Sequence, residues 1–421
     1  MVRKEVLPNG VRIVAESIPH VRSVALGIWV ATGSRDEEPA VAGVSHFLEH
    51  LLFKGTEKRS AKDLAEVLEA VGGQLNAFTS KEYTCYHAKI LDEHFDLALD
   101  VLTDMFFNSR FNEEDIERER RVVLEEIKMY EDSPDEVVHE LLSETMWSTN
   151  SLGKPILGTY ESIDSLSRDM IVDHFHNEYT ANRIVIAVAG RIDPDKVIAQ
   201  IRTHFEKMEK KKNREIRQLP TTTTKVAFVK KDVEQVQLCI GTSGLAHHSS
   251  NIYALHILNN VIGGGASSRL FQEIRENRGL AYSVFSYHSS FSDAGLFSIY
   301  AGTSPNYLQE VLEISIQEMV RIKNEGITEK ELKRIQDQIK GSMYLGLESV
   351  NSRMTRLGRS EILYGRYVTP EEVIEKIYNV TREDVLNLAR QLWTKDQIAL
   401  AIVGSKEPEI ELAEVLHKQG M

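Results

Sequence analysis

The order of hydrophobic and polar positions predicts strands followed by helices in the first half of the chain. Residues 11–16 and 23–31 are rich in β-branched side chains and end in turn signals, as strands do. Residues 44–53 and 61–71 repeat apolar side chains at three- and four-residue intervals, which indicates a helix with one buried face. Two more strands and two long helices are expected to complete the unit, at 74–78, 83–90, 94–108 and 112–130.

A similar order of elements returns roughly 200 residues later, which indicates a duplicated unit and not a short-period solenoid. Its strands and helices are expected at 227–229, 237–241, 252–261, 268–278, 281–286, 295–302, 305–324 and 328–345. Residues 74–90 hold two strands with no helix between them, which favours antiparallel pairing. The pattern therefore predicts an α+β fold of two homologous domains, 1–210 and 226–421, each a mostly antiparallel sheet packed with helices.

A linker is expected between the two domains, at 211–225. The basic run from Lys207 to Lys212 leads into it and overlaps its first two residues, and it contains four consecutive threonines. No aromatic residues alternate with these charges, as they do in proteins that bind single-stranded nucleic acid. A solvated connection is the natural interpretation of this segment.

Composition and charge narrow the possible partners and the compartment. The 421 residues carry a formal charge of -13, which disfavours nucleic acid and an anionic membrane surface as partners. Two cysteines cannot build a disulfide framework, and the first residues lack the features of a signal or transit peptide. No apolar run approaches the roughly 18 residues of a membrane span. We therefore expect a cytoplasmic protein.

Residues 46–50, with the sequence His-Phe-Leu-Glu-His, are the strongest candidate for chemistry. Helical residues four apart differ by about 40° around the axis, so His46 and His50 point the same way and can share a metal ion. Glu49 lies beside this pair and can reach a water on the same ion. Here the Glu precedes the second His, which inverts the commoner zinc-peptidase order. The pattern alone arises by chance in roughly one chain in twenty of this length, so it is only suggestive by itself.

A catalytic zinc site needs a third protein ligand and an open position for water. The acidic segment 117–128 offers Glu119 and Glu126, which lie seven residues apart on one face of the predicted helix. Burying two carboxylates is costly unless a cation receives them, and an ion held by the two histidines would do so. The alternative is that both carboxylates form solvated ion pairs with the neighbouring arginines at 118, 120 and 121.

A resemblance to a known family begins at residues 42–56, Ala-Gly-Val-Ser-His-Phe-Leu-Glu-His-Leu-Leu-Phe-Lys-Gly-Thr. This segment is similar to the signature of the inverted-zincin peptidases, a family that contains pitrilysin, insulin-degrading enzyme and the mitochondrial processing peptidase. The resemblance covers nearly the whole chain, because it continues through 72–79, 117–126, 263–271 and 275–282. Length and composition resemble the short bacterial type, which is similar to the β subunit of the processing peptidase.

The resemblance implies a site for one zinc ion per chain. It makes His46 and His50 metal ligands, Glu49 the general base and Glu126 the third ligand, with the neighbouring Glu125 as the alternative if the helix phase differs. Glu119 matches a carboxylate that holds a ligand in place. The implied reaction is peptide hydrolysis by a metal-activated water, with Glu49 transferring the proton.

The resemblance also implies how a peptide would bind. Asn76, Ala77, Phe78 and Thr79 match an edge strand onto which the substrate backbone adds itself as an extra strand. In the second half, Arg275 and Tyr282 match a pair that grips the peptide and stabilises the oxyanion. The helix expected at 252–261 carries His256 alone and no metal motif, which is why a single ion is expected.

The family's enzymes enclose peptides within four such α/β units, whereas this chain supplies two. Because one chain carries both the metal motif and the Arg275/Tyr282 pair, we expect a homodimer whose sites face an internal chamber. The implied function is a zinc metalloendopeptidase of flexible peptides or unfolded segments. Two alternatives remain: a substrate-binding or scaffold subunit that needs a second chain for activity, and a zinc hydrolase that does not act on peptides.

Overall fold

The computed structural model describes residues 2–211 and 217–421, which form two compact units. Unit 1 comprises Met1–Lys128, Pro155–Arg217 and Leu345–Val368, and unit 2 comprises Met129–Lys154, Gln218–Tyr344 and Thr369–Met421. Each unit therefore takes one segment from the opposite half of the chain. As domain boundaries, 1–210 and 226–421 stay a prediction. Residues 212–216, which include Lys212 and part of the expected linker, lie outside the described residues.

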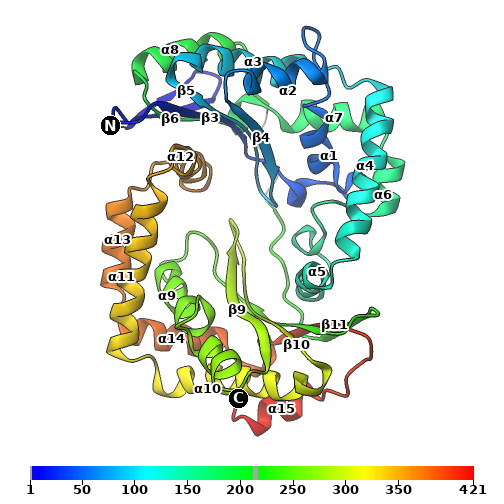
Figure 1. Ribbon diagram of the computed structural model, residues 1–421, viewed down its shortest axis with the longest axis vertical. Helices are drawn as coiled ribbons and strands as arrows, with labels where there is room; N and C mark the ends of the chain where they lie inside the picture. The colour runs from blue at the N-terminus through cyan, green and yellow to red at the C-terminus, as the bar shows by residue number, and fades with distance from the viewer. Residues whose placement is uncertain (1, 212–216) are drawn as a thin grey trace. The chain divides into compact units, whose positions relative to one another are not determined.

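The sheet of unit 1 has six strands in the order β1-β2-β6-β3-β5-β4 (Figure 1). Among its neighbouring strands, β2 and β6 are parallel and all other pairs are antiparallel. The strand bounds are Val2–Val6 for β1, Arg12–Ser17 for β2, Ser23–Val30 for β3, Gln74–Thr79 for β4, Thr84–Leu91 for β5 and Ile184–Gly190 for β6. Strand β4 lies at one edge of the sheet, so one side of its main chain has no strand partner.

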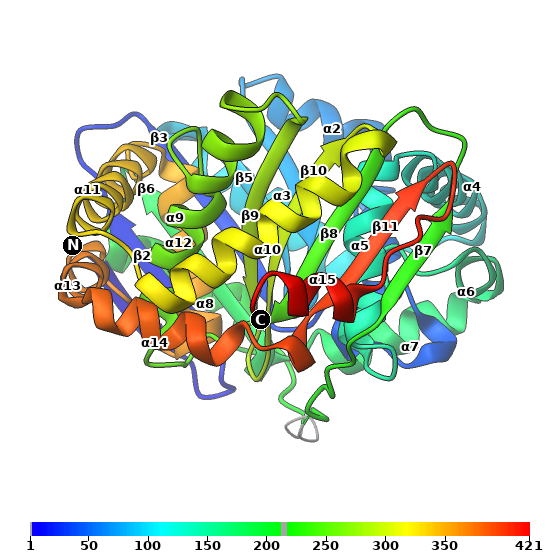
Figure 2. The same cartoon turned by 90° about the horizontal axis from the view of Figure 1, so that it is seen from below.

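The sheet of unit 2 has five strands in the order β7-β11-β8-β10-β9 (Figure 2). Its bounds are Val226–Lys230 for β7, Val236–Ser243 for β8, Ala281–Ser290 for β9, Gly295–Thr303 for β10 and Ala399–Gly404 for β11. Only β7 and β11 pair in parallel, at the position that β2 and β6 occupy in unit 1. The duplicated, mostly antiparallel α+β architecture expected from the sequence is confirmed.

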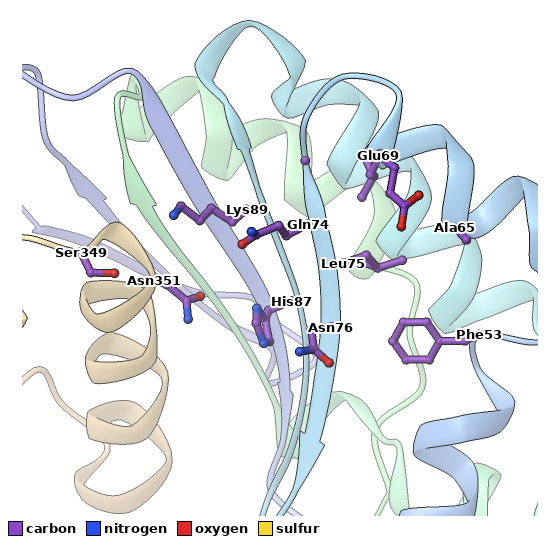
Figure 3. A pocket seen from close by; sticks show the side chains of 12 residues that line it. Phe53, Ala65, Glu69, Gln74, Leu75, Asn76, His87, Lys89, Ser349 and Asn351 are labelled. Atoms are coloured by element: carbon purple, nitrogen blue, oxygen red, sulfur yellow. The ribbon is translucent and has the colours of Figure 1, made fainter. Parts of the chain in front are cut away.

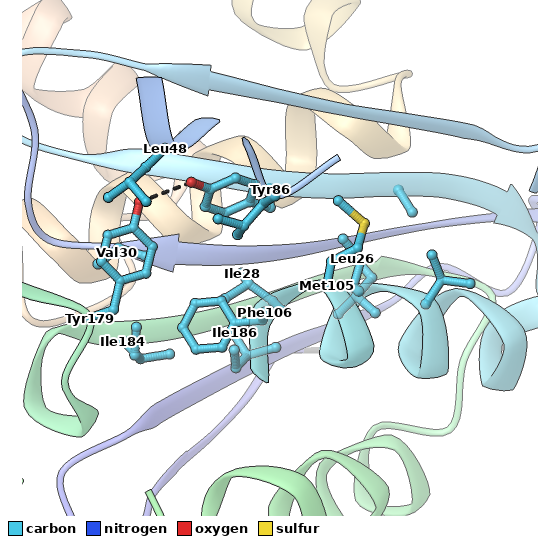
Figure 4. Packing of buried hydrophobic residues seen from close by; sticks show 14 of the residues in the cluster. Leu26, Ile28, Val30, Leu48, Tyr86, Met105, Phe106, Tyr179, Ile184 and Ile186 are labelled. Carbon is cyan, nitrogen blue, oxygen red and sulfur yellow. Dashed lines mark hydrogen bonds between the residues drawn. The ribbon is translucent and has the colours of Figure 1, made fainter. Parts of the chain in front are cut away.

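Strand β3 illustrates why the sheet of unit 1 is buried on both faces. Leu26, Ile28 and Val30 point into one core, whereas Ala25 and Trp29 belong to a second core on the opposite face. Figure 4 shows the first set packed against apolar side chains of β6 and α3. Successive side chains of a strand alternate between faces, so an almost continuous apolar run requires cover on both sides.

Helices from the first half of the chain cover one face of the unit 1 sheet, and all of them contribute to one core. These helices are α1 (Val44–Leu51), α2 (Ala61–Glu69), α3 (Phe95–Asn108), α4 (Glu113–Glu131), α6 (Tyr160–Ser165), α7 (Arg168–Glu178) and α8 (Pro194–Phe205). Within this core the Tyr86 and Tyr179 hydroxyls lie 2.9 Å apart and share a hydrogen bond (Figure 4). This bond satisfies two polar groups that would otherwise be buried at a cost.

The corresponding face of the unit 2 sheet is covered by helices of the second half (Figure 2). They are α9 (Ile252–Gly263), α10 (Leu308–Glu325), α11 (Glu329–Gly346), α13 (Pro370–Asn379), α14 (Arg382–Leu392) and α15 (Leu412–Lys418). The segment expected as a helix at 268–278 instead contains a π-helical turn, Phe271–Glu276. The sequence patterns analysed above did not include β1, β6 and β11.

The second face of each sheet is covered by one helix from the other half of the chain. Helix α12 (Val350–Tyr364) lies against the sheet of unit 1 (Figure 1). It packs there through Val350, Met354 and Leu357, in one core with Trp29. Helix α5 (Pro134–Met146) packs in the same way on the sheet of unit 2. Folding of either unit therefore requires chain from both halves.

Several expectations from composition can be compared with the structure. Cys85 and Cys239 are both buried and free. None of the helices in the described part of the chain combines the length and hydropathy that a bilayer span requires. Within the expected linker, Arg217 forms ion pairs with Asp36 and Glu82 at 2.8 and 2.7 Å.

The contact between α12 and the sheet predicts a position that tolerates only glycine. A Cβ atom at Gly358 would lie 2.3 Å from the ring of Trp29, which is fully buried. We expect Gly358→Ala to lower the free energy of unfolding by about 1–3 kcal/mol, as overpacking does. In contrast, Gly341→Ala in α11 places its Cβ in open space and should be neutral or stabilising by up to about 1 kcal/mol. Urea unfolding followed by circular dichroism measures both, and equal stabilities for the two variants would contradict this packing.

Candidate metal centre

Helix α1 begins at a strained turn that the structure holds from two sides. Gly43 has a φ of +90°, and a Cβ there would lie 2.5 Å from the carbonyl oxygen of Leu157, so only glycine fits. The Glu37 carboxylate accepts hydrogen bonds from the backbone N–H groups of Gly43 and Ser45, each at 2.7 Å. These groups have no partner within the helix, so Glu37 satisfies the start of α1 and fixes its position.

The two histidines of α1 lie one turn apart, as the sequence predicts. Their ring centroids are 4.7 Å apart and the ring planes meet at 67°. Burial, and secondarily the proximity of His50, lower the pKa of His46 to about 4. His46 is therefore neutral near pH 7, which is the state in which imidazole can bind a metal.

Helix α4 brings the carboxylate of Glu126 to this pair. Oε1 lies 3.7 Å from Nε2 of His46, and Oε2 lies 3.6 Å from Nε2 of His50. These distances exceed those of hydrogen bonds, but they approach the roughly 3.4 Å that separates ligand atoms around a tetrahedral ion with bonds near 2.1 Å. Within the described ranges, this is the group of three His, Cys, Asp or Glu side chains whose ligand atoms all lie within 4.8 Å of one another. Two imidazoles and a carboxylate suit zinc with one position left open.

A second carboxylate of α4 holds His50 in place. Glu119 Oε2 lies 3.2 Å from Nδ1 of His50, and Oε1 lies 2.8 Å from Nζ of Lys54. Because a carboxylate only accepts, Nδ1 carries the proton, and Nε2 presents its lone pair to the side of Glu126. Burial raises the pKa of Glu119, but the contacts with His50 and Lys54 outweigh it and lower that pKa overall, so Glu119 stays charged.

The arginines considered as alternative partners of these carboxylates lie elsewhere. Arg118 pairs with Asp115 at 3.1 Å, and Arg120 pairs with Glu117 at 3.0 Å. Within the described residues neither carboxylate forms an ion pair with Arg118, Arg120 or Arg121, so the interpretation of Glu119 and Glu126 as solvated partners of these arginines is wrong. Glu125, the alternative third ligand, is exposed and pairs with Lys128 at 2.7 Å.

Glu49 is held on the side of α1 that faces strand β4. The hydroxyl of Thr79 donates a hydrogen bond of 2.6 Å to Oε2 of Glu49. Burial raises the pKa of Glu49 above its usual value, although Thr79 and His50 act in the opposite direction. A carboxylate with a raised pKa, held by Thr79 beside the two histidines, is suited to accept and return a proton.

The residues expected to bind peptide are distributed over both units. Asn76, Ala77, Phe78 and Thr79 lie in the edge strand β4 of unit 1. Arg275 and Tyr282 lie in unit 2, where the guanidinium of Arg275 stacks 4.6 Å from the centroid of the Tyr282 ring. Tyr282 is 77% exposed, so this stacked pair presents a polar, aromatic surface to solvent.

His256, expected to be alone on the counterpart helix, has a histidine partner. Its Nδ1 lies 3.0 Å from Nε2 of His288 on β9. The expectation of one histidine and no metal motif on that helix is unaffected, because His288 lies on β9; the contact joins residues 32 positions apart through packing of α9 on β9.

Two supporting residues of the site were absent from the sequence analysis. Glu37 precedes α1 by seven residues, and no local motif announces that its carboxylate returns to the helix start. Lys54 follows His50 by four residues but lies beyond the end of α1 at Leu51, so helical spacing gave no signal for its contact with Glu119.

Comparison with known proteins gives matches along nearly the whole chain. Residues 12–160 match the model of the insulinase family, peptidase family M16, and residues 165–339 match that of the peptidase M16 inactive domain. A Bacillus subtilis relative named uncharacterized zinc protease YmxG is 50% identical over 403 residues, which cover 96% of this chain and 98% of that protein. A Streptomyces coelicolor relative named uncharacterized zinc protease SCO5738 is 43% identical over 411 residues, covering 96% and 89%.

Two solved structures share the fold. A protease from Helicobacter pylori aligns with a TM-score of 0.90 at 22% identity and covers 97% of this chain and 100% of its own. A peptidase M16 inactive domain from Pseudomonas fluorescens aligns with a TM-score of 0.91 at 18% identity, covering 97% and 99%.

The contact between Glu37 and the start of α1 predicts a pH-dependent stability. Burial raises the pKa of Glu37 from 4.5 to about 7, against the hydrogen bonds from Ser45 and Gly43. The folded chain therefore keeps a proton that the unfolded chain releases, so this stabilisation is complete below pH 4.5 and is lost as pH rises to 7. We expect the stability of the parent relative to Glu37→Gln to fall across that interval, measured by urea unfolding. Glu38 is the exposed neighbour and supplies a control: the free energy of unfolding of Glu38→Gln should depend on pH as that of the parent does. If the free energy of unfolding of Glu37→Gln also follows the pH dependence of the parent, the coupling is refuted.

Proposed function

The chain belongs to peptidase family M16, the insulinase family, and we propose that it is an active zinc metalloendopeptidase of flexible peptides and unfolded segments. The observation that carries this proposal is the convergence of His46, His50 and Glu126 from two helices, with Glu49 beside them. The relatives named as zinc proteases support the same chemistry. A cytoplasmic location, expected from the cysteine content, stays a prediction.

We assign His46, His50 and Glu126 as the ligands of one zinc ion per chain. The lone pairs on the two Nε2 atoms and the carboxylate of Glu126 supply three donors of the type that zinc prefers. These residues would hold zinc, which when bound would supply an acidified water and a Lewis acid for the scissile carbonyl. Glu119, itself paired with Lys54, keeps the ring of His50 oriented with Nε2 toward Glu126.

Glu49 is assigned as the general base. Its carboxylate takes a proton from the attacking water and delivers it to the leaving amine nitrogen. The hydrogen bond from Thr79 fixes one carboxylate oxygen, so the other keeps a defined direction for the transfer. Partial burial raises the pKa of Glu49 and brings the carboxyl closer to the pH at which both transfers must occur.

The substrate is proposed to add as a strand to the free edge of β4, along Asn76–Thr79. An edge strand offers unpaired N–H and C=O groups to any extended peptide, which explains a preference for flexible segments. Arg275 and Tyr282 of unit 2 are assigned to grip the peptide and to donate to the oxyanion. Since each chain carries both components, we further propose a homodimer in which each chain completes the site of its partner.

Variants of Glu126 and Glu49 separate the two proposed roles, because loss of a zinc ligand lowers the zinc content of the protein and loss of the general base lowers its turnover. Glu126→Gln should lower zinc affinity by about 100-fold or more, because even residues that support a ligand are typically worth 10–100-fold. Glu49→Gln should keep one zinc per chain and lower kcat by roughly 10²–10⁴-fold, as loss of a general base does. Metal analysis and cleavage of a quenched peptide measure both.

Glu125→Gln is the matched control for this set. It removes the same charge one residue away on the exposed side of α4, so zinc and turnover should both be retained. Full activity of Glu49→Gln would refute its assignment as the base. If Glu126→Gln retains zinc and Glu125→Gln loses it, Glu125 would be assigned as the third ligand in place of Glu126.

The proposed dimer predicts complementation between two inactive variants. Glu49→Gln and Arg275→Ala, each inactive alone, are mixed and allowed to exchange chains. If each site combines the two chains, a mixed dimer contains one intact site, and roughly a quarter of the parent activity should return after random pairing. Light scattering gives the assembly state in parallel. A fully active monomer, or mixtures that stay inactive although the chains exchange, would rule out shared sites.

A further inference from the structure

A groove follows the free edge of β4 away from the metal centre. It encloses about 690 Å³, within the range of pockets that bind small ligands, and all its residues belong to unit 1 (Figure 3). It is lined by residues of β4 and β5, of α2, of the turn after α1 and of the start of α12. Because the groove contains Gln74, Leu75 and Asn76, it lies along the main chain to which a peptide would pair.

The two sides of β4 give this groove two different walls. Figure 3 shows polar side chains on the side of α12 and mostly apolar ones on the side of α2. The polar wall consists of Gln74, Asn76, His87, Lys89, Ser349 and Asn351. In the register of the sheet Gln74 is opposite Lys89 and Asn76 is opposite His87, which places these four side chains on one face.

The apolar wall is built around Leu75, whose side chain points to the opposite face from those of Gln74 and Asn76. Phe53, Ala65 and Leu68 complete it, and Glu69 lies on the same side of β4 (Figure 3). Side chains of an added strand alternate between the two faces in the same way. Neighbouring residues of a bound peptide would therefore meet opposite walls.

The polar wall carries a positive charge without a counterion. Lys89 is exposed and forms no ion pair within the described ranges of the chain, and no carboxylate lines this side of the groove. Within the described part of the chain, the buried Nδ1 of His87 and Oδ1 of Asn351 have no hydrogen-bond partner, so this wall has no internal group that would compete with a ligand for its lysine.

We propose that this groove selects substrates with an acidic side chain three to five residues from the scissile bond, flanked by an apolar residue. The spacing follows from the strand: Asn76 and Gln74 precede Thr79, which bonds to Glu49, by three and five residues. At about 3.3 Å per residue this corresponds to roughly 10–17 Å. The acidic side chain reaches Lys89, and its neighbour packs on Leu75 and Phe53. This inference rests on the proposed function, because it assumes that the bound strand is the peptide to be cut.

The test uses quenched peptides that share one cleavage site and differ at a single position. Glu, Gln or Lys is placed at the third, fourth or fifth residue on either side of the bond. The parent protein should show a KM about two- to tenfold lower for Glu than for Lys at one of these positions, the range for exposed charge pairs. Because the groove lies away from the reacting atoms, kcat should be the same for all peptides. The preference should also weaken with added salt.

Two lysine variants identify the origin of the preference. Lys89→Glu should reverse it, whereas Lys58→Glu makes the same charge change at an exposed position outside the groove and should keep it. Ala65→Asp puts a charge on the apolar wall and should raise KM for peptides with an apolar neighbour. Equal effects of Lys89→Glu and Lys58→Glu, or a parent that cleaves all peptides with one KM, would overturn the inference.

Binding to the Glu49→Gln protein separates this inference from the proposed function. Fluorescence anisotropy of the same labelled peptides gives Kd without turnover, so the preference for Glu and its reversal in a Glu49→Gln, Lys89→Glu double variant can be measured even where nothing is cleaved. A parent that cleaves no peptide but binds with this preference contradicts the endopeptidase assignment alone. Cleavage without any charge preference contradicts the groove alone.

Discussion

The need to bury both faces of each sheet is the constraint from which the rest of this structure follows. In unit 1, β3 sends Leu26 and Ile28 to one core and Trp29 to another, so helices on a single side would leave Trp29 in water. Helix α12 covers that second face although it lies more than 300 residues away along the chain. Helix α5 does the same for unit 2. With both faces covered, the edge of β4 is where unit 1 offers main chain next to the metal-binding side chains.

The same packing also stabilises the candidate metal centre, whose partly buried histidines and carboxylates would be unfavourable by themselves. Helix α1 is short and mostly buried, and it places the neutral ring of His46 against the apolar core. The carboxylate of Glu126 lies 3.7 and 3.6 Å from the two imidazole nitrogens, longer than hydrogen bonds, and a divalent cation could be bound by all three side chains. The carboxylate of Glu37 holds the start of α1, and Glu119, paired with Lys54, holds the ring of His50, so both support the position of the cluster.

Strands and helices could be predicted where the sequence pattern lies within one element, whereas the candidate site could be predicted only in part. Periodicity identified the strand at 23–31 and the helix at 44–53, and spacing within one helix brought His46 and His50 together. Choosing Glu126 over Glu125 required the phase of α4 relative to α1, which depends on packing between helices and cannot be read from either helix alone. That α5 and α12 each pack on the sheet of the other half of the chain could not be predicted for a similar reason. An amphipathic pattern indicates that a helix has a buried face but not which sheet it covers.

The contact between α9 and β9 in unit 2 corresponds to the contact between α1 and β4 in unit 1, but it is built without the candidate metal site. Helix α9 packs on the edge strand β9 as α1 packs on β4, and each pair of elements is joined by a side-chain bond. In unit 2 that bond joins two imidazoles, His256 and His288, at 3.0 Å, and one neutral ring can donate to the other with no ion between them. In the candidate metal site of unit 1, the carboxylate of Glu126 lies 3.6 Å from Nε2 of His50, longer than a hydrogen bond and close to the separation of two ligands of one ion. The two units thus differ in several side chains at this place: α1 carries a second histidine and Glu49, and α4 brings Glu126 to the histidines, whereas α9 carries His256, which contacts His288.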